Sequence, residues 1–566
     1  MASEAQDRPV SGVVARPLVI DWRAGLRLRG VAQAGVFALF VGALFYLLAG
    51  VHLVVNAYDE GFALYGAARV AAGEVPYRDF WLVYAPGQFY LLAGLFKLFG
   101  ESVLVERLWD VAARLAIVAL VYALTQRLAS RRAAVAAVLL VTIWLAAADY
   151  FGYAVFPALA CSLAAIWCLL RAAERGSARW LAAAGVAIGG STLFRHDIGG
   201  YTLVPASLAA LALACTGAPA PHRLRAVLRR VVGAQLALAA GVVVVLGPVA
   251  AYLLANVDAA ILWDSLVVYP LTLNRAISYL PYPPLLPPLP PRGAAELARW
   301  WGQFGEAWLW FYVPPLVCVL GLATAGWCLR RARSSARISR LQALALLALF
   351  GLMLCNHTLN RYDRMHALPA ALCALVVAAG LLAHMPPVGR ALRLSIAPLL
   401  AVALGGAFVV APLRLYWERT SYFTPLVCHA ELPRAGCADL YPDQEEAFAY
   451  IQAHTAPDER IFVGLARHDR IYASDVIFYF LAERHSATRY HELISGVATT
   501  RPVQEEIVAD LERQAVRYVV TTDNYEGVHE PNASALSSGV TLLDDYIRAH
   551  YEPVATFVAY TIWRRR

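Results

Sequence analysis

Two adjacent acidic residues, Asp59 and Glu60, follow the first long apolar run of the chain. Apolar residues continue after them at helical spacing until Gly73, which predicts a short amphipathic helix at a membrane surface. A carboxylate held there can act as a general base toward a hydroxyl group or bind a divalent metal ion. The alternative is a solvated helix start, because acidic side chains stabilise the positive end of a helix dipole. Composition alone favours this alternative.

Three ionisable residues, Arg195, His196 and Asp197, interrupt an apolar stretch that otherwise runs over residues 180–215. Ionisable groups at membrane depth cost free energy, and they are usually functional or paired with each other. A guanidinium group can bond two oxygens of one phosphate, so the cluster predicts a phosphate site at the outer end of these helices. The alternative is an internal ion pair of Arg195 with Asp149 or Asp197 that only closes a helix bundle.

A second basic run, residues 360–366, holds Arg361 and Arg364 on either side of Tyr362 and Asp363. Two arginines in a short outer loop oppose the charge bias of the other loops, and an anionic ligand would offset their cost. Snorkelling of the same side chains at the membrane interface explains the run equally well.

These residues are set in a chain with the composition of a membrane protein. It is 60% hydrophobic and only 16% charged, whereas a soluble chain carries about 25% charged residues. The charge is absent from repeated apolar runs of about 18–24 residues, the length that crosses a bilayer core. We predict about eleven membrane-spanning helices, at residues 31–54, 104–124, 133–148, 155–171, 180–195, 198–215, 231–254, 307–328, 341–356, 367–384 and 394–412.

The charged loops predict the orientation of these helices. The formal net charge is +8, and Lys97 is the only lysine, an arginine bias typical of a GC-rich bacterial genome. If residues 1–30 form a cytoplasmic segment, every inside loop is basic, as the positive-inside rule requires. An odd number of spans then places the C-terminus outside, and the chain is predicted to be a multi-pass protein of the inner (plasma) membrane. The arginines form no continuous basic face, so no nucleic-acid partner is expected.

Two domains follow from this organisation. Residues 31–412 are the predicted membrane domain, with long outer loops at 55–103 and 255–306. Residues 413–566 have ordinary composition and alternate strand and helix patterns, which indicates a soluble α/β domain outside the cytoplasm. Its predicted strands are 460–464, 517–521 and 554–563, and its predicted helices are 442–454, 474–483 and 502–514.

Two of the nine cysteines, Cys428 and Cys437, fall in this C-terminal domain, while the others lie in or beside apolar runs. Disulfides persist outside the cytoplasm, and Pro433 and Gly436 let the chain turn back between the two residues. We therefore predict a disulfide, with two free buried thiols as the alternative. No CxxC pair or Cys/His cluster has zinc-site spacing.

The order of the motifs resembles the GT-C superfamily of membrane glycosyltransferases, in particular the protein mannosyltransferase and lipid A aminoarabinose transferase type. The resemblance covers residues 31–215 well and the later spans only in general architecture. The family's usual His-Pro-Pro or Tyr-Pro-Pro is Tyr84-Ala85-Pro86 here. The elements that carry the resemblance are Asp59-Glu60, the Pro-Tyr-Arg-Asp-Phe sequence at 76–80, the Tyr-Ala-Pro-Gly-Gln sequence at 84–88, and residues 101–114.

The resemblance implies a fold, a reaction and its substrates. The fold is an α-helical polytopic membrane bundle of GT-C type with a C-terminal soluble α/β domain. An acidic residue at the position of Asp59 acts on the acceptor in that superfamily, so Asp59 would take the proton from an acceptor hydroxyl. The donor would be a polyprenyl-phosphate sugar in the lipid bilayer, and the acceptor a glycan, a lipid or a protein. A single displacement at the anomeric carbon would invert its configuration.

The resemblance also orders the remaining candidate residues. Related enzymes place a cation where Arg195 lies, which favours the phosphate interpretation of that cluster. A second acidic residue is common in the turn that holds Asp149, although Asp149 is equally well explained as a turn residue that bonds its own backbone. No cofactor is required, but Asp59 and Asp149 could hold a divalent metal ion. The candidate phosphate ligands are Arg195, His196, Arg361, Arg364 and Arg78. Weaker candidates either line an acceptor groove or merely pack: Asp264, Tyr269 and Arg275.

Two other classes of function are compatible with parts of the sequence. A transporter or flippase of lipid-linked glycans would also need outer arginines and long spans. It would not need paired carboxylates, and inverted repeats, which the sequence does not show, would be expected. A non-catalytic scaffold is a third class, and Arg195 at membrane depth argues against it.

Overall fold

The computed structural model describes residues 22–215, 224–286, 293–332, 334–384, 402–420 and 427–566. The chain divides into a short unit that ends at Gly42 and a second unit, Ala43–Arg566, which contains every candidate site residue. The first long helix, α1 (Trp22–Leu48), begins in the short unit and ends in the second.

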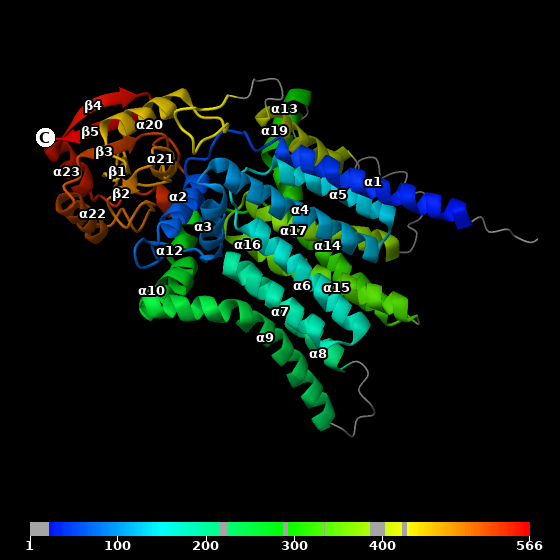
Figure 1. Cartoon of the computed structure of the whole chain (residues 1–566). Coiled ribbons are helices and arrows are strands. Elements are labelled where there is room, and N and C mark those ends of the chain that lie inside the picture. Colours follow the sequence, from blue (N-terminus) through cyan, green and yellow to red (C-terminus); the bar gives the residue numbers. More distant parts are fainter. Residues whose placement is uncertain (1–21, 216–223, 287–292, 333, 385–401, 421–426) are drawn as a thin grey trace, which may run out of the picture. The chain divides into compact units, whose positions relative to one another are not determined.

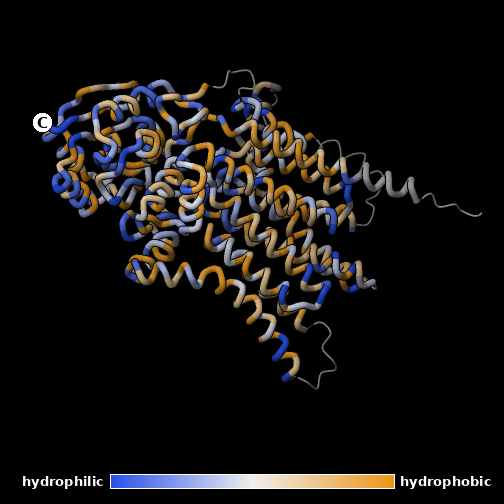
Figure 2. The backbone as a smooth tube through the Cα atoms, viewed as in Figure 1, coloured by the Kyte–Doolittle hydropathy of each residue, from blue (hydrophilic) through white to orange (hydrophobic). Residues whose placement is uncertain are grey.

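A bundle of long apolar helices forms the membrane region of this unit (Figure 1). Hydrophobic residues dominate these helices, as the colouring of Figure 2 shows. The long helices of the bundle are α4 (Val103–Leu128), α5 (Arg131–Ala147), α6 (Val155–Arg175), α7 (Ala178–Phe194), α8 (His196–Cys215), α9 (Leu224–Asn256), α14 (Glu306–Leu329), α15 (Ser335–Leu354) and α17 (Arg364–His384).

The structure does not confirm the predicted number of membrane spans. Within the described residues, seven helices are long and apolar enough to cross a membrane. Helices α5 and α7 have only 17 residues each. The predicted span at 394–412 lies partly outside the described residues. The structure therefore confirms a polytopic helical protein but not a count of eleven spans.

The apolar stretch at residues 180–215 consists of two helices, as predicted. Helix α7 ends where Arg195 adopts an extended backbone, and α8 starts at the next residue. The junction places Arg195, His196 and Asp197 together at one end of both helices, which is the position that the phosphate and ion-pair interpretations share.

Shorter helices fill the two long outer loops. The first loop contains α2 (Asp59–Ala71) and α3 (Gly87–Phe99), and the second contains α10 (Ala259–Trp263), a π-helical turn η1 (Asp264–Val268), α11 (Tyr269–Leu271), α12 (Leu273–Ser278) and α13 (Ala294–Trp300). Proline-rich residues 280–286 are not helical, in line with the sequence pattern, and residues 287–292 lie outside the described part.

Helix α2 is not the surface helix that the sequence predicted. Ten of its thirteen residues are buried, because α3 packs on one side of it and α21 (Ile477–Leu481) of the C-terminal domain on another. Gly61 makes this contact possible, since a Cβ atom there would lie 2.2 Å from the backbone nitrogen of Ile477. The residues that looked like the polar face of an interfacial helix instead contact protein.

The C-terminal domain contains a five-stranded sheet in the order β2-β1-β3-β5-β4. Strands β1 (Arg460–Leu465) and β3 (Tyr518–Thr522) are parallel and almost fully buried, as expected for strands covered on both faces. The remaining elements are β2 (His485–Ser486), β4 (Tyr551–Phe557), β5 (Tyr560–Arg565), α20 (Pro442–His454), α22 (Arg501–Arg513) and α23 (Leu542–His550).

The final strand predicted at 554–563 is wrong, because this stretch is the hairpin of β4 and β5. The chain reverses at Val558 and Ala559, where Val558 has a positive φ of 23°. Glycine and asparagine usually mark such a turn, and neither is present. The other predicted strands and helices agree with the structure to within a few residues.

The C-terminal domain and the first outer loop share one hydrophobic core. Buried residues of α2 and α3, such as Leu64 and Phe96, pack with Phe448, Phe478 and Phe480 of the C-terminal domain. The domain boundary predicted near residue 413 therefore separates two regions of sequence composition that fold against each other.

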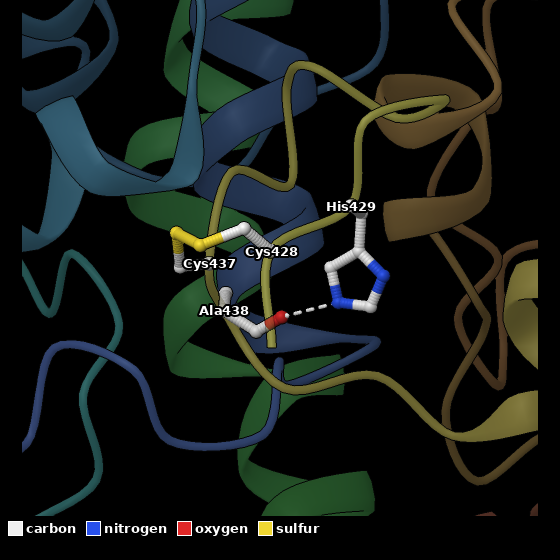
Figure 3. Close-up of a disulfide and its surroundings, with 4 residues drawn as sticks. All are labelled: Cys428, His429, Cys437 and Ala438. Atoms are coloured by element: carbon white, nitrogen blue, oxygen red, sulfur yellow. Dashed lines mark hydrogen bonds between the residues drawn. A yellow bond between two sulfur atoms is a disulfide. The ribbon is translucent and has the colours of Figure 1, made fainter. Parts of the chain in front are cut away.

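A disulfide joins Cys428 to Cys437 in the segment that leads into this domain (Figure 3). The imidazole of His429 donates to the carbonyl oxygen of Ala438 at 3.0 Å, and Gly436 takes the positive φ of 61° that the tight loop needs. The loop contacts the membrane region directly, since the backbone N–H of Val103 donates to the carbonyl oxygen of Arg434 at 2.9 Å.

Candidate active site

A cavity of about 1260 Å³ lies between the ends of the membrane helices, the two outer loops and the C-terminal domain. Most of the candidates named from the sequence line it: Asp59, Asp149, Arg195, His196, Tyr269, Arg275, Arg361 and Arg364. These residues are up to 305 positions apart in the chain. The structure therefore brings together acidic and basic groups that the sequence linked only through their predicted side of the membrane.

Asp59 lines the cavity at the start of helix α2. Its backbone N–H and that of Tyr58 donate to the side-chain oxygen of Asn56, at 2.8 Å and 3.0 Å, so that Asn56 caps the start of α2. The Asp59 carboxylate itself has no ion pair among the residues that the structure describes. It is accessible from the cavity, and it can therefore accept a proton from a bound hydroxyl group.

The neighbouring Glu60 has a different environment. Its side chain is fully buried and forms a two-pronged ion pair with Arg107, with nitrogen–oxygen distances of 2.6 Å and 2.9 Å. It also accepts a hydrogen bond from the backbone N–H of Asn56 at 2.9 Å. Glu60 does not line the cavity, so the structure places it as a support for the chain before Asp59.

The environment of Asp59 sets a pH dependence. Enclosure by protein raises the pKa of Asp59 to about 6, the charge of Asp149 adds to this, and Arg361 and His366 oppose it. A general base acts only in its ionised form. If Asp59 is the base, kcat/KM is expected to be constant at neutral pH and to fall about tenfold per pH unit below the pKa. A pH profile of kcat/KM measures this, and a profile that stays flat well below the pKa would contradict the role.

Asp149 lies in the turn between α5 and α6 and is paired with Arg419. Arg419 ends α19 (Ala411–Arg419), which the sequence had not connected with the site. The backbone of the same turn is held by Arg114, which donates to the carbonyl oxygens of Leu145 and Asp149. Asp149 is thus a fixed cavity residue with an existing counter-ion.

The two carboxylates do not fit a metal site. Asp149 already pairs with an arginine, and no cluster of three or more histidine, cysteine, aspartate or glutamate side chains suited to a metal ion occurs in the described ranges. Divalent ions prefer several oxygen ligands around one point. We therefore derive no step through a metal.

Arg195 forms the internal ion pair that was one of its two predicted interpretations. Its Nε and Nη2 atoms donate to the two carboxylate oxygens of Asp197 at 3.1 Å and 2.9 Å. His357 approaches the same carboxylate at 3.4 Å. The guanidinium group still faces the cavity, so an anion there would share it with Asp197.

Arg361 is held by carboxylates from two parts of the chain. It bonds Asp363 at 2.9 Å, and Glu530 of the C-terminal domain at 2.6 Å and 2.9 Å. Arg364 pairs with Glu306. Arg275, on α12, differs from these residues, because it lines the cavity without an ion pair to any described residue.

Two of the predicted candidates lie elsewhere. Arg78 is about half exposed and pairs with Asp79 at 2.8 Å, outside the cavity lining. Asp264 begins the π-helical turn η1 and does not line the cavity either. Sequence reasoning in turn missed cavity residues that follow Asp59 by hundreds of positions: His357, Arg419, Tyr472, Ser495 and Glu530.

Comparison with known proteins agrees with this architecture. The chain is similar to the structure of ArnT from Cupriavidus metallidurans bound to undecaprenyl phosphate, with a TM-score of 0.51 and 13% sequence identity over 94% of this chain and 98% of that chain. It is also similar to the oligosaccharyltransferase AglB from Archaeoglobus fulgidus in complex with an inhibitory peptide and a dolichol-phosphate, with a TM-score of 0.46 and 13% identity over 87% of this chain and 69% of that chain. Comparison with curated proteins gives no match.

The likeness to ArnT extends over nearly the whole of both chains and shows that this protein has the GT-C fold of membrane glycosyltransferases. The fold that the motif resemblance implies is thereby confirmed. Residues 84–246 match the family described as dolichyl-phosphate-mannose-protein mannosyltransferase. The matched segment contains Arg107, Asp149 and Arg195, and it begins after Asp59.

Proposed function

We propose that this protein is a glycosyltransferase that moves a sugar from a polyprenyl-phosphate donor to an acceptor hydroxyl, with Asp59 as the general base. The observation that carries the proposal is the Asp59 carboxylate, which has no ion pair among the described residues and faces a cavity whose wall also holds arginine side chains. The family match and the undecaprenyl phosphate bound to the similar ArnT structure support the class of donor.

The reaction follows from this arrangement. Asp59 accepts the proton of the acceptor hydroxyl while its oxygen attacks the anomeric carbon of the sugar. The bond between that carbon and the phosphate oxygen breaks, and its electron pair leaves with the lipid phosphate. The leaving phosphate needs no proton, so no acid opposite Asp59 is required. The cavity arginines stabilise the negative charge that grows on it. One displacement of this kind inverts the anomeric carbon.

The pairing of the arginines suggests an order of contacts with the donor phosphate. At Arg195, Arg361 or Arg364 the phosphate has to share the guanidinium group with a carboxylate that is already bound. At Arg275, which has no ion pair to any residue that the structure describes, the phosphate does not have to share the guanidinium group. We therefore assign the first contact with the phosphate to Arg275, and the stabilisation of the developing charge to Arg195.

Replacing Arg275 by Ala is expected to weaken binding of undecaprenyl phosphate about 10- to 100-fold, the usual effect of losing a hydrogen bond to a charged group. Arg78→Ala is the matched control, because Arg78 is an arginine on the same outer loops but outside the cavity. Displacement of a labelled lipid phosphate measures both variants. Equal affinities for Arg275→Ala and Arg78→Ala would remove Arg275 from the donor site.

We place the reaction at the outer face of the inner membrane, with the C-terminus outside, because the basic loops favour this orientation. The C-terminal domain contributes Tyr472, Ser495 and Glu530 to the cavity wall. We therefore propose that the acceptor, whether a glycan, a lipid or a protein segment, enters between the outer loops and this domain.

Mass spectrometry of lipids that purify with the protein, followed by a transfer assay with polyprenyl-phosphate sugars, tests the function. We expect a polyprenyl phosphate or its sugar ester in the purified sample, and transfer of the sugar to an acceptor. Movement of a lipid-linked glycan across the bilayer with no transfer would overturn the proposal and favour the transporter class.

A further inference from the structure

A buried acidic residue of the C-terminal domain, Glu492, contacts the residue that precedes Asp59. Its side chain is 1% exposed. One carboxyl oxygen accepts a hydrogen bond from the hydroxyl group of Tyr58 at 2.8 Å, and the other is buried without a partner among the described residues. Tyr58 lines the cavity beside Asp59. Glu492, which lies 434 positions after Tyr58 in the chain, thus contacts the start of the helix that carries Asp59.

The same domain holds the rest of this helix start. The carbonyl oxygen of Ala57 accepts hydrogen bonds from the backbone N–H groups of Val476 and Ile477, at 3.1 Å and 3.0 Å. In the second turn of α2, the hydroxyl oxygen of Tyr65 accepts from the backbone N–H of Ser486 at 2.6 Å. The first two turns of α2 are therefore fixed from the side of the C-terminal domain.

We propose that Glu492 is a positioning residue of the transfer reaction: through the Tyr58 hydroxyl it fixes the first turn of α2 and so the direction in which Asp59 presents its carboxylate. The inference rests on the proposed function of Asp59. It gives the C-terminal domain a part in catalysis, because the base is oriented by a side chain of that domain. Small displacements of a reacting group cost about 100-fold in rate.

The hydrogen bond, and not a negative charge, carries this role. Burial raises the pKa of Glu492 to about 8, and the charge of Asp59 acts in the same direction, while the hydrogen bond from Tyr58 opposes it. The protonated carboxyl group therefore predominates at neutral pH. An amide of the same shape keeps an oxygen acceptor for Tyr58, whereas alanine removes the acceptor.

Four variants separate this role from general support of the fold: Glu492→Gln, Glu492→Ala, Tyr58→Phe, and the double variant Glu492→Ala with Tyr58→Phe. We expect Glu492→Gln to keep kcat within about threefold of wild type. Glu492→Ala and Tyr58→Phe should each lower kcat about 10- to 100-fold with little change in the donor KM. The double variant should be no slower than the slower single variant, because both changes remove the same hydrogen bond.

Tyr490→Phe is the matched control. It removes another hydrogen bond between a tyrosine and a glutamate, from Tyr490 to Glu506 at 2.9 Å, which lies entirely within the C-terminal domain. It should leave kcat unchanged. A loss equal to that of Tyr58→Phe would show that any weakening of the domain slows transfer, and would overturn the proposal.

Three other results would also overturn it: an impaired Glu492→Gln, losses that multiply in the double variant, or full activity of Glu492→Ala in an enzyme that transfers sugar. The last result leaves the proposed function intact. Absence of sugar transfer by the wild-type protein would contradict both the proposed function and the role of Glu492. If Glu492→Ala does not fold, Glu492→Gln and Tyr58→Phe still decide the question, because one keeps the hydrogen bond and the other deletes it.

Discussion

Replacing Asp59 by Asn is expected to lower kcat for sugar transfer by about 100- to 10,000-fold, the usual contribution of a general base. Asparagine has nearly the same size and can still face the cavity, but it cannot accept a proton from a hydroxyl group at neutral pH. The fold should not suffer, since no ion pair joins the Asp59 carboxylate to the described part of the chain. Steady-state rates with a polyprenyl-phosphate sugar measure the loss.

The affinity for the lipid phosphate shows whether Asp59→Asn affects the chemical step or the binding of the donor. Removing a base alters the transition state more than the bound ground state, so kcat should fall while binding of undecaprenyl phosphate stays almost unchanged. Arg275→Ala should instead weaken the binding of undecaprenyl phosphate. Asp149→Asn is the control for acidity in the cavity, because Asp149 already has Arg419 as its counter-ion. Normal turnover in Asp59→Asn would transfer the role of base to Asp149.

The sequence could predict that Asp59, Arg195 and Arg361 lie at the same face of the membrane, because the charge of the loops indicates their orientation. The positive-inside rule assigns each loop to one side of the membrane, so residues far apart in sequence are expected at the same face. However, two residues on the same side of the membrane need not lie close to each other. The rule placed Arg78 on the correct loop, but the structure pairs it with Asp79 outside the cavity.

The partners of the arginines could not be predicted. Glu530 meets Arg361 from 169 residues further along the chain, and Arg419 meets Asp149 across 270 residues. Such pairs depend on how the C-terminal domain and helix α19 pack, and a local pattern carries no information about that packing. Their effect is large, since within the described part of the chain they leave Arg275, a weak candidate from sequence, as the cavity arginine without a carboxylate partner.

The position of α2 shows a related limit. Its apolar spacing correctly predicted a helix that starts at Asp59. The polar and small residues between the apolar ones suggested a face toward water, but Gly61 and Gly66 allow close contact with protein. Periodicity reports which positions are apolar, and it does not reveal whether small residues face solvent or another backbone.

Replacing Arg107 by Met is expected to destabilise the protein by about 3–5 kcal/mol, because it leaves a buried carboxylate without its counter-ion. Arg107 and Glu60 are both fully buried. The same guanidinium group donates to the carbonyl oxygens of three residues just before α2: Val51, Leu53 and Val54. Methionine fills much of the space but supplies none of these donors. The midpoint of thermal unfolding in detergent measures the loss.

Two further variants identify the cause of the stability loss in Arg107→Met. Arg78→Met removes an arginine from an exposed ion pair, and it should change stability by less than about 1 kcal/mol. Combining Arg107→Met with Glu60→Leu removes the uncompensated charge, so part of the lost stability should return. The return should be incomplete, because the three carbonyl oxygens remain without their donor. Transfer activity should stay low in the double variant even where stability recovers, since the segment that carries Asp59 has lost its anchor on α4. An unfolding midpoint for Arg107→Met equal to that of wild type would mean that the buried pair does not hold this segment.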